Sequence, residues 1–386
     1  MEDQHHVYHF SGSHYEMGFQ QGQIFRESLV KAFDAFKNYP DIRKLRPKLI
    51  PQGIFFLLAA KKSRKWFEPT LRKLAPNQAE RIHGISDGSG ISQNLIYLLC
   101  STELLLTKKT YDIPIIDACT SISYDKTKTE RGHAMVSRNF DYRYMVVPHL
   151  RIRKNSPNNG LQNYDVTASP LPGTFNGINE KGVFIGTDEV SAIKEVVPNN
   201  ALPASILIQE SLEYATSSQE VFEYFKQQHR GSSNSVMVND PSGDMFVMEY
   251  TSKRIIKRSP LKNYIHATNH FISEELKEVD MPSNAIYTKT AGPLAGIRIQ
   301  ESTYTRYQTA GLRLDSQEVF SIDEMKSLLS DHSATSNGIL DRNCLCRHGP
   351  IMTSASSMIF DLESMDAWIS FGSPCKNEYI HHKITF

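Results

Sequence analysis

The first third of the chain repeats apolar side chains at the spacing of an α-helix. Between residues 11 and 37, aromatic residues and leucine recur every three or four positions, which predicts one amphipathic helix with a single apolar stripe. Gly18 and Gly22 lie one turn apart in this stretch, so another element could pack closely against it. A polar, proline-containing stretch at 40–51 predicts a loop, and residues 53–108 are expected to be largely helical.

After residue 118 the apolar positions change to the two-residue period of β-strands. Residues 120–124 alternate in this way, and a second strand is expected at 133–142, beyond a charged run typical of a hairpin turn. Pro203 and the capping-box patterns at Ser217 and Ser321 predict three later helices. Further strands are expected at 164–168, 175–178, 182–187, 235–239, 245–250, 264–268, 356–360 and 367–371. This order of elements favours a layered α+β domain over an alternating parallel fold.

Composition narrows the class of protein. The 386 residues are 40% hydrophobic and carry a net charge of +1, which argues against binding to nucleic acid or to an anionic membrane. Five cysteines are few and odd in number, so a disulfide framework is not expected. The N-terminus lacks the apolar run of a signal peptide, and no stretch approaches the ~18 apolar residues of a membrane span. We expect a soluble, cytoplasmic protein.

The candidate chemistry begins at Cys119, which opens the first predicted strand. The hairpin would return Arg138 and Asp141 to its side. An arginine beside a thiol favours the nucleophilic thiolate, and a carboxylate can hold a protonatable amine. A lone cysteine is more often an ordinary buried residue, so Cys119 needs support from other motifs.

That support comes from a resemblance carried by four motifs in order. They are Cys-Thr-Ser at 119–121, Arg-Asn-Phe-Asp at 138–141, Asn-Glu-Lys-Gly at 179–182 and Thr-Asn-His-Phe at 268–271. The chain thereby resembles the peptidase C45 group of the N-terminal nucleophile hydrolases, which contains penicillin acyltransferases and linear-amide hydrolases, and more distantly the choloylglycine hydrolases. The resemblance implies a four-layer αββα sandwich. It also implies a helical prosegment at 1–118 and a nucleophile domain at 119–386.

The resemblance also implies roles for individual residues. The precursor would cut itself between Ala118 and Cys119, and the freed Cys119 would be the nucleophile with its own α-amino group as base. Arg138 would favour the thiolate and Asp141 would orient the α-amino group. Asn269 would donate into the oxyanion hole, and Arg306 would support the nucleophile. The substrate would be a small-molecule linear amide and no cofactor would be needed. The resemblance leaves open whether the acyl group goes to water or to another acceptor, and whether the protein forms a homo-oligomer. The short and long chains produced by the cut would remain associated.

Two departures from the related patterns affect the expected site. Choloylglycine hydrolases have an asparagine near the end of the strand after Asn-Glu-Lys-Gly, where this chain has Thr187 and Asp188. The second oxyanion donor would then be a backbone N–H or the Thr187 hydroxyl. Ala118 stands where penicillin acyltransferases have glycine.

The sequence also offers three other interpretations. Ser86 lies in a Gly-x-Ser-x-Gly match at 84–88, typical of a serine nucleophile after a strand, but the preceding residues predict a helix that ends at a glycine cap. Cys344, Cys346 and His348 offer three metal ligands without the paired spacing of structural zinc sites, so no metal is expected. The third alternative is an uncleaved, inactive relative that binds an acylated small molecule or a protein partner.

Overall fold

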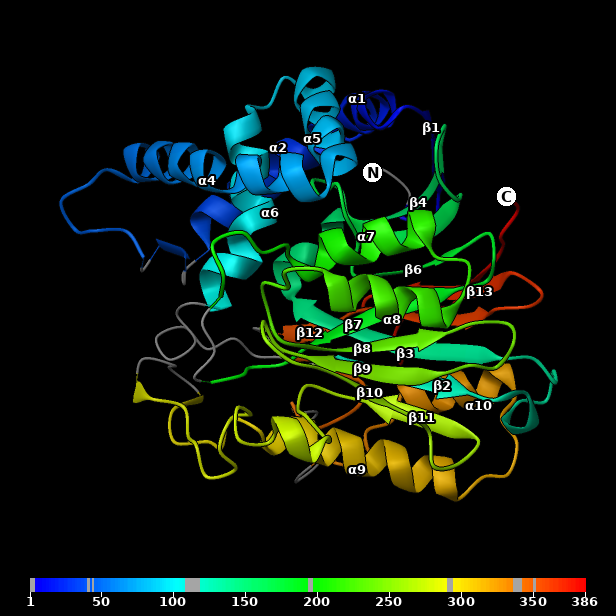
Figure 1. Ribbon diagram of the computed structural model, residues 1–386. Helices are drawn as coiled ribbons and strands as arrows, with labels where there is room; N and C mark the ends of the chain where they lie inside the picture. The colour runs from blue at the N-terminus through cyan, green and yellow to red at the C-terminus, as the bar shows by residue number, and fades with distance from the viewer. Residues whose placement is uncertain are drawn as a thin grey trace.

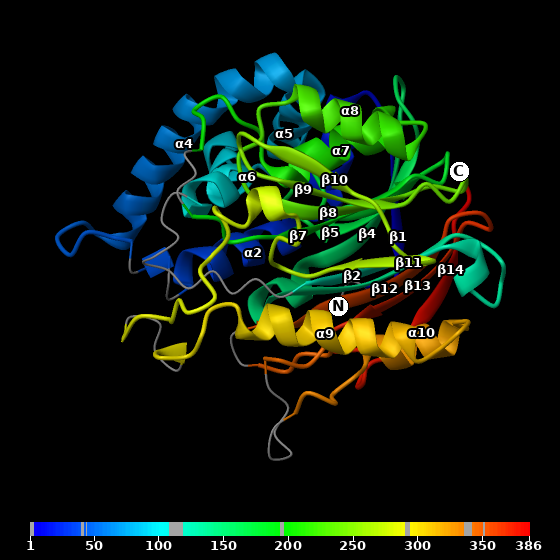
Figure 2. The same ribbon diagram turned by 60° about the horizontal axis from the view of Figure 1, so that its bottom comes forward.

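Two β-sheets pack face to face between two layers of helices in the computed structural model of the chain (Figures 1 and 2). The structure describes residues 4–39, 42–43, 45–107, 119–193, 197–289, 294–335, 342–349 and 352–386. The predicted α+β class and the four-layer αββα arrangement are confirmed. Ala118, the first residue of the expected cleavage site, lies outside the described residues.

One sheet has eight strands, and its first strand comes from the predicted prosegment. Its order is β1 (Val7–Gly12), β4 (Leu150–Pro157), β5 (Asn163–Ala168), β6 (Asn176–Asn179), β7 (Phe184–Glu189), β8 (Asn234–Asn239), β9 (Phe246–Tyr250) and β10 (Ile255–Arg258). β1 pairs with β4 in parallel, whereas the other neighbours are antiparallel. The N-terminal segment therefore completes a sheet that is otherwise made of residues after 119.

The other sheet has six antiparallel strands and carries the candidate nucleophile. Its order is β11 (Tyr264–Ala267), β2 (Thr120–Tyr124), β3 (Met135–Arg143), β12 (Met352–Asp361), β13 (Asp366–Phe371) and β14 (Ile380–Lys383). In this register Ser121 lies opposite Arg138 on one side and Ala267 on the other. Cys119 thus precedes a central strand, flanked by β3 and by the end of β11.

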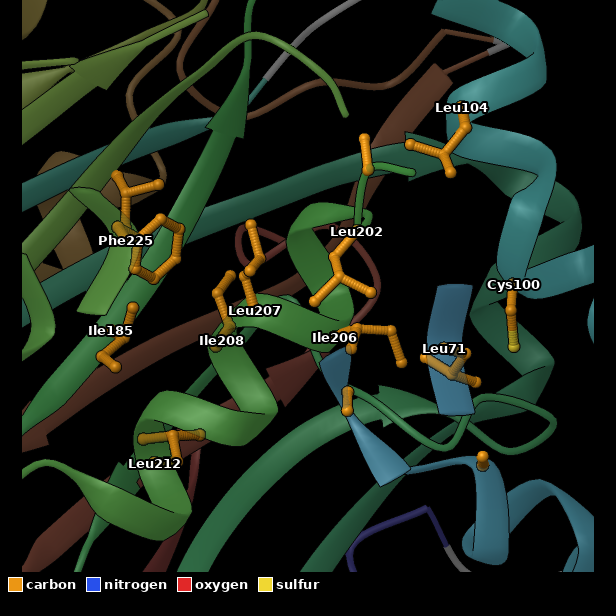
Figure 3. Close-up of a cluster of buried hydrophobic side chains, with 14 of the residues drawn as sticks. Leu71, Cys100, Leu104, Ile185, Leu202, Ile206, Leu207, Ile208, Leu212 and Phe225 are labelled. Carbon is orange, nitrogen blue, oxygen red and sulfur yellow. The ribbon is translucent and has the colours of Figure 1, made fainter. Parts of the chain in front are cut away.

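Helices cover the outer faces of both sheets. The eight-stranded sheet is covered by the N-terminal helices α1 (His14–Ile24), α2 (Arg26–Asn38), α4 (Gln52–Leu74), α5 (Pro76–Ser89) and α6 (Gln93–Thr107), and by α7 (Ala204–Tyr214) and α8 (Ser218–Gln227). In the core on that face, Leu71 and Leu104 lie near α7 (Figure 3). α9 (Glu301–Asp315) and α10 (Ile322–Leu329) cover the six-stranded sheet (Figure 2). A third apolar core fills the space between the sheets.

The single helix predicted over residues 11–37 is wrong in detail. Residues 7–12 form β1, and α1 begins only after Ser13, which forms a capping box with Glu16. A second break falls at Phe25, which leaves helical geometry and whose side chain is completely buried. The predicted apolar stripe is therefore divided between α1 and α2.

The close approach predicted for Gly18 and Gly22 is confirmed, and α5 is the element that packs there. A Cβ atom at Gly18 would lie 2.2 Å from the Arg81 carbonyl oxygen, and one at Gly84 would lie 2.0 Å from the Tyr15 carbonyl oxygen. Gly84 and Gly88 lie inside α5, where any side chain would prevent the backbones of α1 and α5 from coming so close. The glycine cap predicted within 84–88 lies instead at Gly90, which has a φ of 75°.

Most predicted strands are confirmed within a few residues, but β4, β10 and β14 were missed along with β1. In β4 only two apolar residues alternate with Arg151 and Arg153 before a polar run begins, so the strand pattern is too short to stand out in the sequence. Arg153 is completely buried, because its guanidinium forms an ion pair with Asp165 at 2.9 Å. β14 has an exposed, histidine-containing sequence at the sheet edge. Among the described helices, none is both long and apolar enough to span a bilayer.

Candidate active site

Cys119 lies at the wall of a cavity of about 210 Å³, which is lined by residues of the N-terminal helices and of the two sheets. Its side chain is buried, and the Sγ atom donates to the backbone carbonyl of Asp141 across 3.6 Å. The hairpin of β2 and β3 creates this contact, since it returns residue 141 to the start of β2. The predicted neighbourhood of Cys119 and Asp141 is therefore present.

Arg306 reaches Cys119 from α9, on the outer face of the six-stranded sheet. Its Nη1 atom donates to the carbonyl oxygen of Cys119 at 2.5 Å and to Oγ1 of Thr120 at 3.0 Å. The guanidinium is completely buried, and burial lowers its pKa to about 10. Although it lies on a helix that covers the sheet, Arg306 is therefore not a solvent-exposed charge. Arg306 holds the backbone of the candidate nucleophile in place.

Asn269 follows β11 and shares the cavity wall with Cys119. Its Oδ1 accepts from Arg306 at 2.8 Å, and its Nδ2 donates to the Glu189 carbonyl at 2.9 Å. The backbone N–H donates to Thr303 Oγ1 at 2.8 Å, which fixes the residue to α9. An amide nitrogen carries two N–H donors, so one remains beyond the bond to Glu189.

Arg138 lies on β3, next to the strand that follows Cys119, in a buried ion pair with Asp188. Its Nη1 donates to Asp188 Oδ1 at 3.0 Å and to Ser121 Oγ at 2.8 Å, and its Nη2 donates to the Thr187 carbonyl. Ser121 in turn donates to Asp188 at 3.0 Å. The positive charge of Arg138 is therefore largely balanced by a carboxylate beside it.

Burial outweighs Arg138 in its effect on the thiol. Burial raises the pKa of Cys119 to about 12, although the charge of Arg138 lowers it, while Asp188 and Asp141 add to the rise. Cys119 in the intact chain is thus a neutral thiol. The expected stabilisation of the thiolate by Arg138 has the predicted sign but is too small to deprotonate the thiol.

The carboxylate of Asp141 is buried beside three arginines. Burial raises its pKa to about 6, opposed by Arg347, Arg306, the Ser354 hydroxyl and Arg138. Neither carboxylate oxygen has a hydrogen bond of normal geometry within the described part of the chain. A buried carboxylate without a donor is costly, which makes Asp141 a site for an additional cation or donor.

Thr187 and Asp188 point to different partners. The Thr187 hydroxyl donates to Asn234 Oδ1 at 2.8 Å, and its backbone N–H donates to Phe175 at 3.0 Å. The Thr187 hydroxyl, one of the donors considered for the oxyanion, is therefore already engaged, as is the N–H of the same residue. Asp188 contributes instead to the ion pair with Arg138.

The cavity is lined mainly by apolar side chains from both parts of the chain. The N-terminal part contributes Ala32, Phe36, Tyr39 and Ile42 and four residues between 99 and 103, whereas β3, β5 and the segment at 145–150 contribute from the later part. Phe140, Tyr142 and Phe175, which also line the cavity, stack their rings on one another. Glu103, Arg143, Glu189 and Asn234 are among the polar residues that also line it.

Sequence reasoning missed Arg347, Thr303 and Asn234. Arg347 lies in the Cys-Arg-His run at 346–348, for which the sequence predicted no role of the arginine, and its buried charge acts on both Asp141 and Cys119. Ser86, the alternative nucleophile, lies inside α5 and donates to the Ile91 carbonyl at 2.7 Å. It forms no strand-to-helix elbow and does not line the cavity.

Comparison with known proteins gave a match to a family model and several weak similarities. A protein of unstated activity from Archaeoglobus fulgidus is 22% identical over 417 residues, and the match covers 95% of this chain. The chain spans 64% of the length of that relative.

Among solved structures, a variant of conjugated bile acid hydrolase from Clostridium perfringens is 14% identical, with a TM-score of 0.43 over 69% of this chain and 97% of the other. Penicillin V acylase from Agrobacterium tumefaciens is 13% identical, with a TM-score of 0.43 over 69% of this chain and 86% of the other. The family model matches residues 127–376, well over half of the chain, in a range that begins after Cys119 and includes the other candidate residues up to Arg347. The chain belongs to the acyl-coenzyme A:6-aminopenicillanic acid acyl-transferase family.

Proposed function

We propose that the protein is a self-processing cysteine amidohydrolase or acyltransferase that acts on linear amides with an apolar acyl group. One observation carries the proposal: the Cys119 thiol lies on the wall of an apolar cavity while Arg306 holds its carbonyl group. The membership of the acyl-transferase family supports an activity on acyl groups.

Self-cleavage would come first. The Cys119 sulfur attacks the carbonyl carbon of Ala118, the C–N bond breaks, and the thiol proton moves to the departing nitrogen. Water then hydrolyses the resulting thioester, which leaves a carboxylate on Ala118 and restores the thiol. The products are a short chain of residues 1–118 and a long chain of residues 119–386.

Cleavage would create the base that the intact site lacks. The new α-amino group of Cys119 has an ordinary pKa of about 7.7 to 8.0, which suits a general base near neutral pH. In its protonated form it is a cation beside Asp141, whose carboxylate has no normal hydrogen bond in the intact chain. Asp141 would thus orient the amine, and the amine would activate the thiol.

In the catalytic cycle the thiolate attacks the carbonyl carbon of the amide substrate. The second N–H of Asn269 stabilises the developing oxyanion, and Arg306 keeps both Asn269 and Cys119 in place. The leaving amine takes the proton and departs, which leaves a thioester on Cys119. Water or an acceptor amine then takes the acyl group and restores the thiol.

The cavity supports the assignment of the acyl group. Aromatic and aliphatic side chains dominate its lining, so an apolar acyl chain would lose water-exposed surface on entering it. A second candidate function, binding of an acylated molecule without chemistry, is favoured by the raised pKa of Cys119 in the intact chain.

The intact mass of freshly purified protein tests the proposal. Wild type should separate into fragments that meet at the 118/119 bond, whereas Cys119→Ala should remain a single chain. Cys100→Ala is the matched control, because Cys100 is also buried and lines the same cavity. It should cleave like wild type.

A screen of linear amides with apolar acyl groups would follow, with the acyl-enzyme trapped and its mass measured. An acyl adduct on the long chain of wild type, absent from Cys119→Ala, is the expected result. Cleavage of the Cys119→Ala chain would contradict the mechanism. An intact wild-type chain that binds but does not turn over acylated ligands would favour the second function.

A further inference from the structure

Four metal-ligating side chains meet near the start of β12 and the end of β13, and none of them lines the cavity. His332 follows α10, Cys346 and His348 flank Arg347, and Cys375 lies in the turn after β13. One ligand atom from each of the four lies within 4.8 Å of all the others. None of these residues has a part in the chemistry proposed above.

The distances match a tetrahedral site. Nε2 of His348 lies 3.2 Å from Nε2 of His332, 3.4 Å from Sγ of Cys346 and 3.1 Å from Sγ of Cys375. Zinc bonds of ~2.0 Å to nitrogen and ~2.3 Å to sulfur place tetrahedral ligands about 3.3 to 3.8 Å apart. A small adjustment of the side chains would accommodate an ion between them.

Hydrogen bonding alone does not account for this arrangement. A neutral imidazole nitrogen either donates one hydrogen or accepts one, yet His348 Nε2 faces two sulfur atoms and another ring nitrogen. Two thiolates and two imidazoles directed at a common centre are a ligand set that zinc prefers. We propose that His332, Cys346, His348 and Cys375 bind one structural zinc ion.

The surrounding backbone is already built to hold the ligands. The carbonyl of Arg347, between Cys346 and His348, accepts from the Ser354 N–H at 3.2 Å and from Ser373 Oγ at 2.9 Å. The Cys346 N–H donates to the Asp331 carbonyl at 3.2 Å, next to His332. Three separate segments of the chain are thus held together at the point where the ligands meet.

The ion would also fix one residue of the active site. Cys346 and His348 are two positions apart and point to the ligand cluster, whereas the side chain of Arg347 between them is buried and acts on Asp141. Zinc would therefore hold the segment that places this positive charge near Cys119. The inference does not depend on the proposed reaction, since the site is separate from the cavity.

Metal content of the full chain, produced without a histidine tag, tests the inference. Wild type should contain about one zinc ion per chain after dialysis against buffer without chelator, as expected for a site with four protein ligands. Cys375→Ser, a conservative change at an exposed position, should lower the zinc content by at least about tenfold. Cys344→Ser should keep it, because Cys344 is two residues from Cys346 but outside the cluster.

A second measurement uses only the wild-type chain. Removal of zinc with a strong chelator should lower the unfolding temperature, and added zinc should restore it. Cobalt in place of zinc should give thiolate-to-cobalt charge-transfer absorption, which Cys375→Ser would lose. Wild type that neither contains zinc nor takes it up would overturn the inference. So would equal zinc contents in wild type and Cys375→Ser, or a mass two hydrogens lower that shows a Cys346–Cys375 disulfide.

Discussion

Five buried charged side chains surround Cys119: Arg138, Arg306, Arg347, Asp141 and Asp188. Taking such groups out of water is costly unless each finds a partner of opposite charge or good hydrogen bonds. Arg138 and Asp188 form an ion pair, although Nε of Arg138 and one oxygen of Asp188 have no hydrogen bond among the described residues, whereas both oxygens of Asp141 lack a hydrogen bond of normal geometry. The intact site therefore contains an unfavourable group at the position where cleavage would release a positive charge.

The pH dependence of stability should reveal the raised pKa of Asp141. Burial raises its pKa from 3.8 to about 6, so between these values the folded chain retains a proton that the unfolded chain releases. The free energy of unfolding should therefore fall as pH rises through this window. In a Cys119→Ala background, which keeps the chain intact, Asp141→Asn removes this dependence. The stability of the Asn variant relative to its parent should increase by about 2 kcal/mol between pH 4 and pH 7.

Denaturant unfolding at a series of pH values measures this difference. A relative stability that stays constant from pH 4 to pH 7 would show that Asp141 is not protonated in the intact fold. Cleaved wild type should show a weaker dependence, because the α-ammonium group would stabilise the charged carboxylate.

Loss of the Asn269 side chain should lower the rate of Cys119 acylation more than it lowers the stability of the fold. Asn269→Ala removes a side-chain N–H donor beside Cys119 while its backbone N–H still bonds to Thr303. We expect the acylation rate of Cys119 by an activated acyl ester to fall by about 10²- to 10³-fold. Asn139→Ala is the control: this buried amide donates to the carbonyls of Leu329 and Leu345, so its loss should lower the unfolding temperature and spare the rate. Equal rate losses in both variants would argue against an oxyanion role.

The elements differ in how well local sequence predicts them. The alternation at 120–124 and the capping box at Ser321 are properties of a few neighbouring residues, and both predictions are confirmed. β1 was missed because its pairing partner, β4, lies about 140 residues later in the chain. A strand stabilised mainly by a distant partner has no local signal strong enough to separate it from the helix that follows.

In the candidate site too, short motifs could be predicted from the sequence, whereas contacts between distant segments could not. Arg306 and Asn269 were predicted from the order of motifs, and the structure brings them together with Cys119, although their roles stay predictions. Cys375 and His332 lie 29 and 14 residues from Cys346, so their meeting depends on the path of the chain rather than on any short spacing. Long-range convergence of this kind is visible only in the folded molecule.

The contact between α1 and α5 gives a prediction at the level of elements. Gly84→Ala would place a Cβ atom 2.0 Å from the Tyr15 carbonyl oxygen, so the helices would have to separate. We expect the free energy of unfolding to fall by about 1 to 3 kcal/mol. Gly53→Ala in α4 meets no atom within 4 Å and should raise stability by up to about 1 kcal/mol. Thermal unfolding of both variants checks the contrast, and similar effects would show that α1 and α5 pack loosely.

At the scale of the whole molecule, the N-terminal part shares a sheet and an apolar core with the rest of the chain. β1 belongs to the same sheet as β4, and the N-terminal helices share an apolar core with α7 and α8. After cleavage we therefore expect the two chains to elute together in gel filtration and to separate only in denaturant. Residues 119–386 produced alone should aggregate, because the edge of β4 and this apolar face would be exposed. A soluble long chain with an unchanged unfolding temperature would contradict this expectation.

The bond between Arg306 and the Cys119 carbonyl spans 187 residues of sequence, and Arg347 lies farther still toward the C-terminus. A ribosome adds about 5 to 20 residues per second, so Arg306 is synthesised roughly 10 to 40 seconds after Cys119. During that time the peptide bond before Cys119 has no assembled machinery beside it. Self-cleavage would therefore be delayed by the order of synthesis, and a truncated or stalled chain would be left uncut.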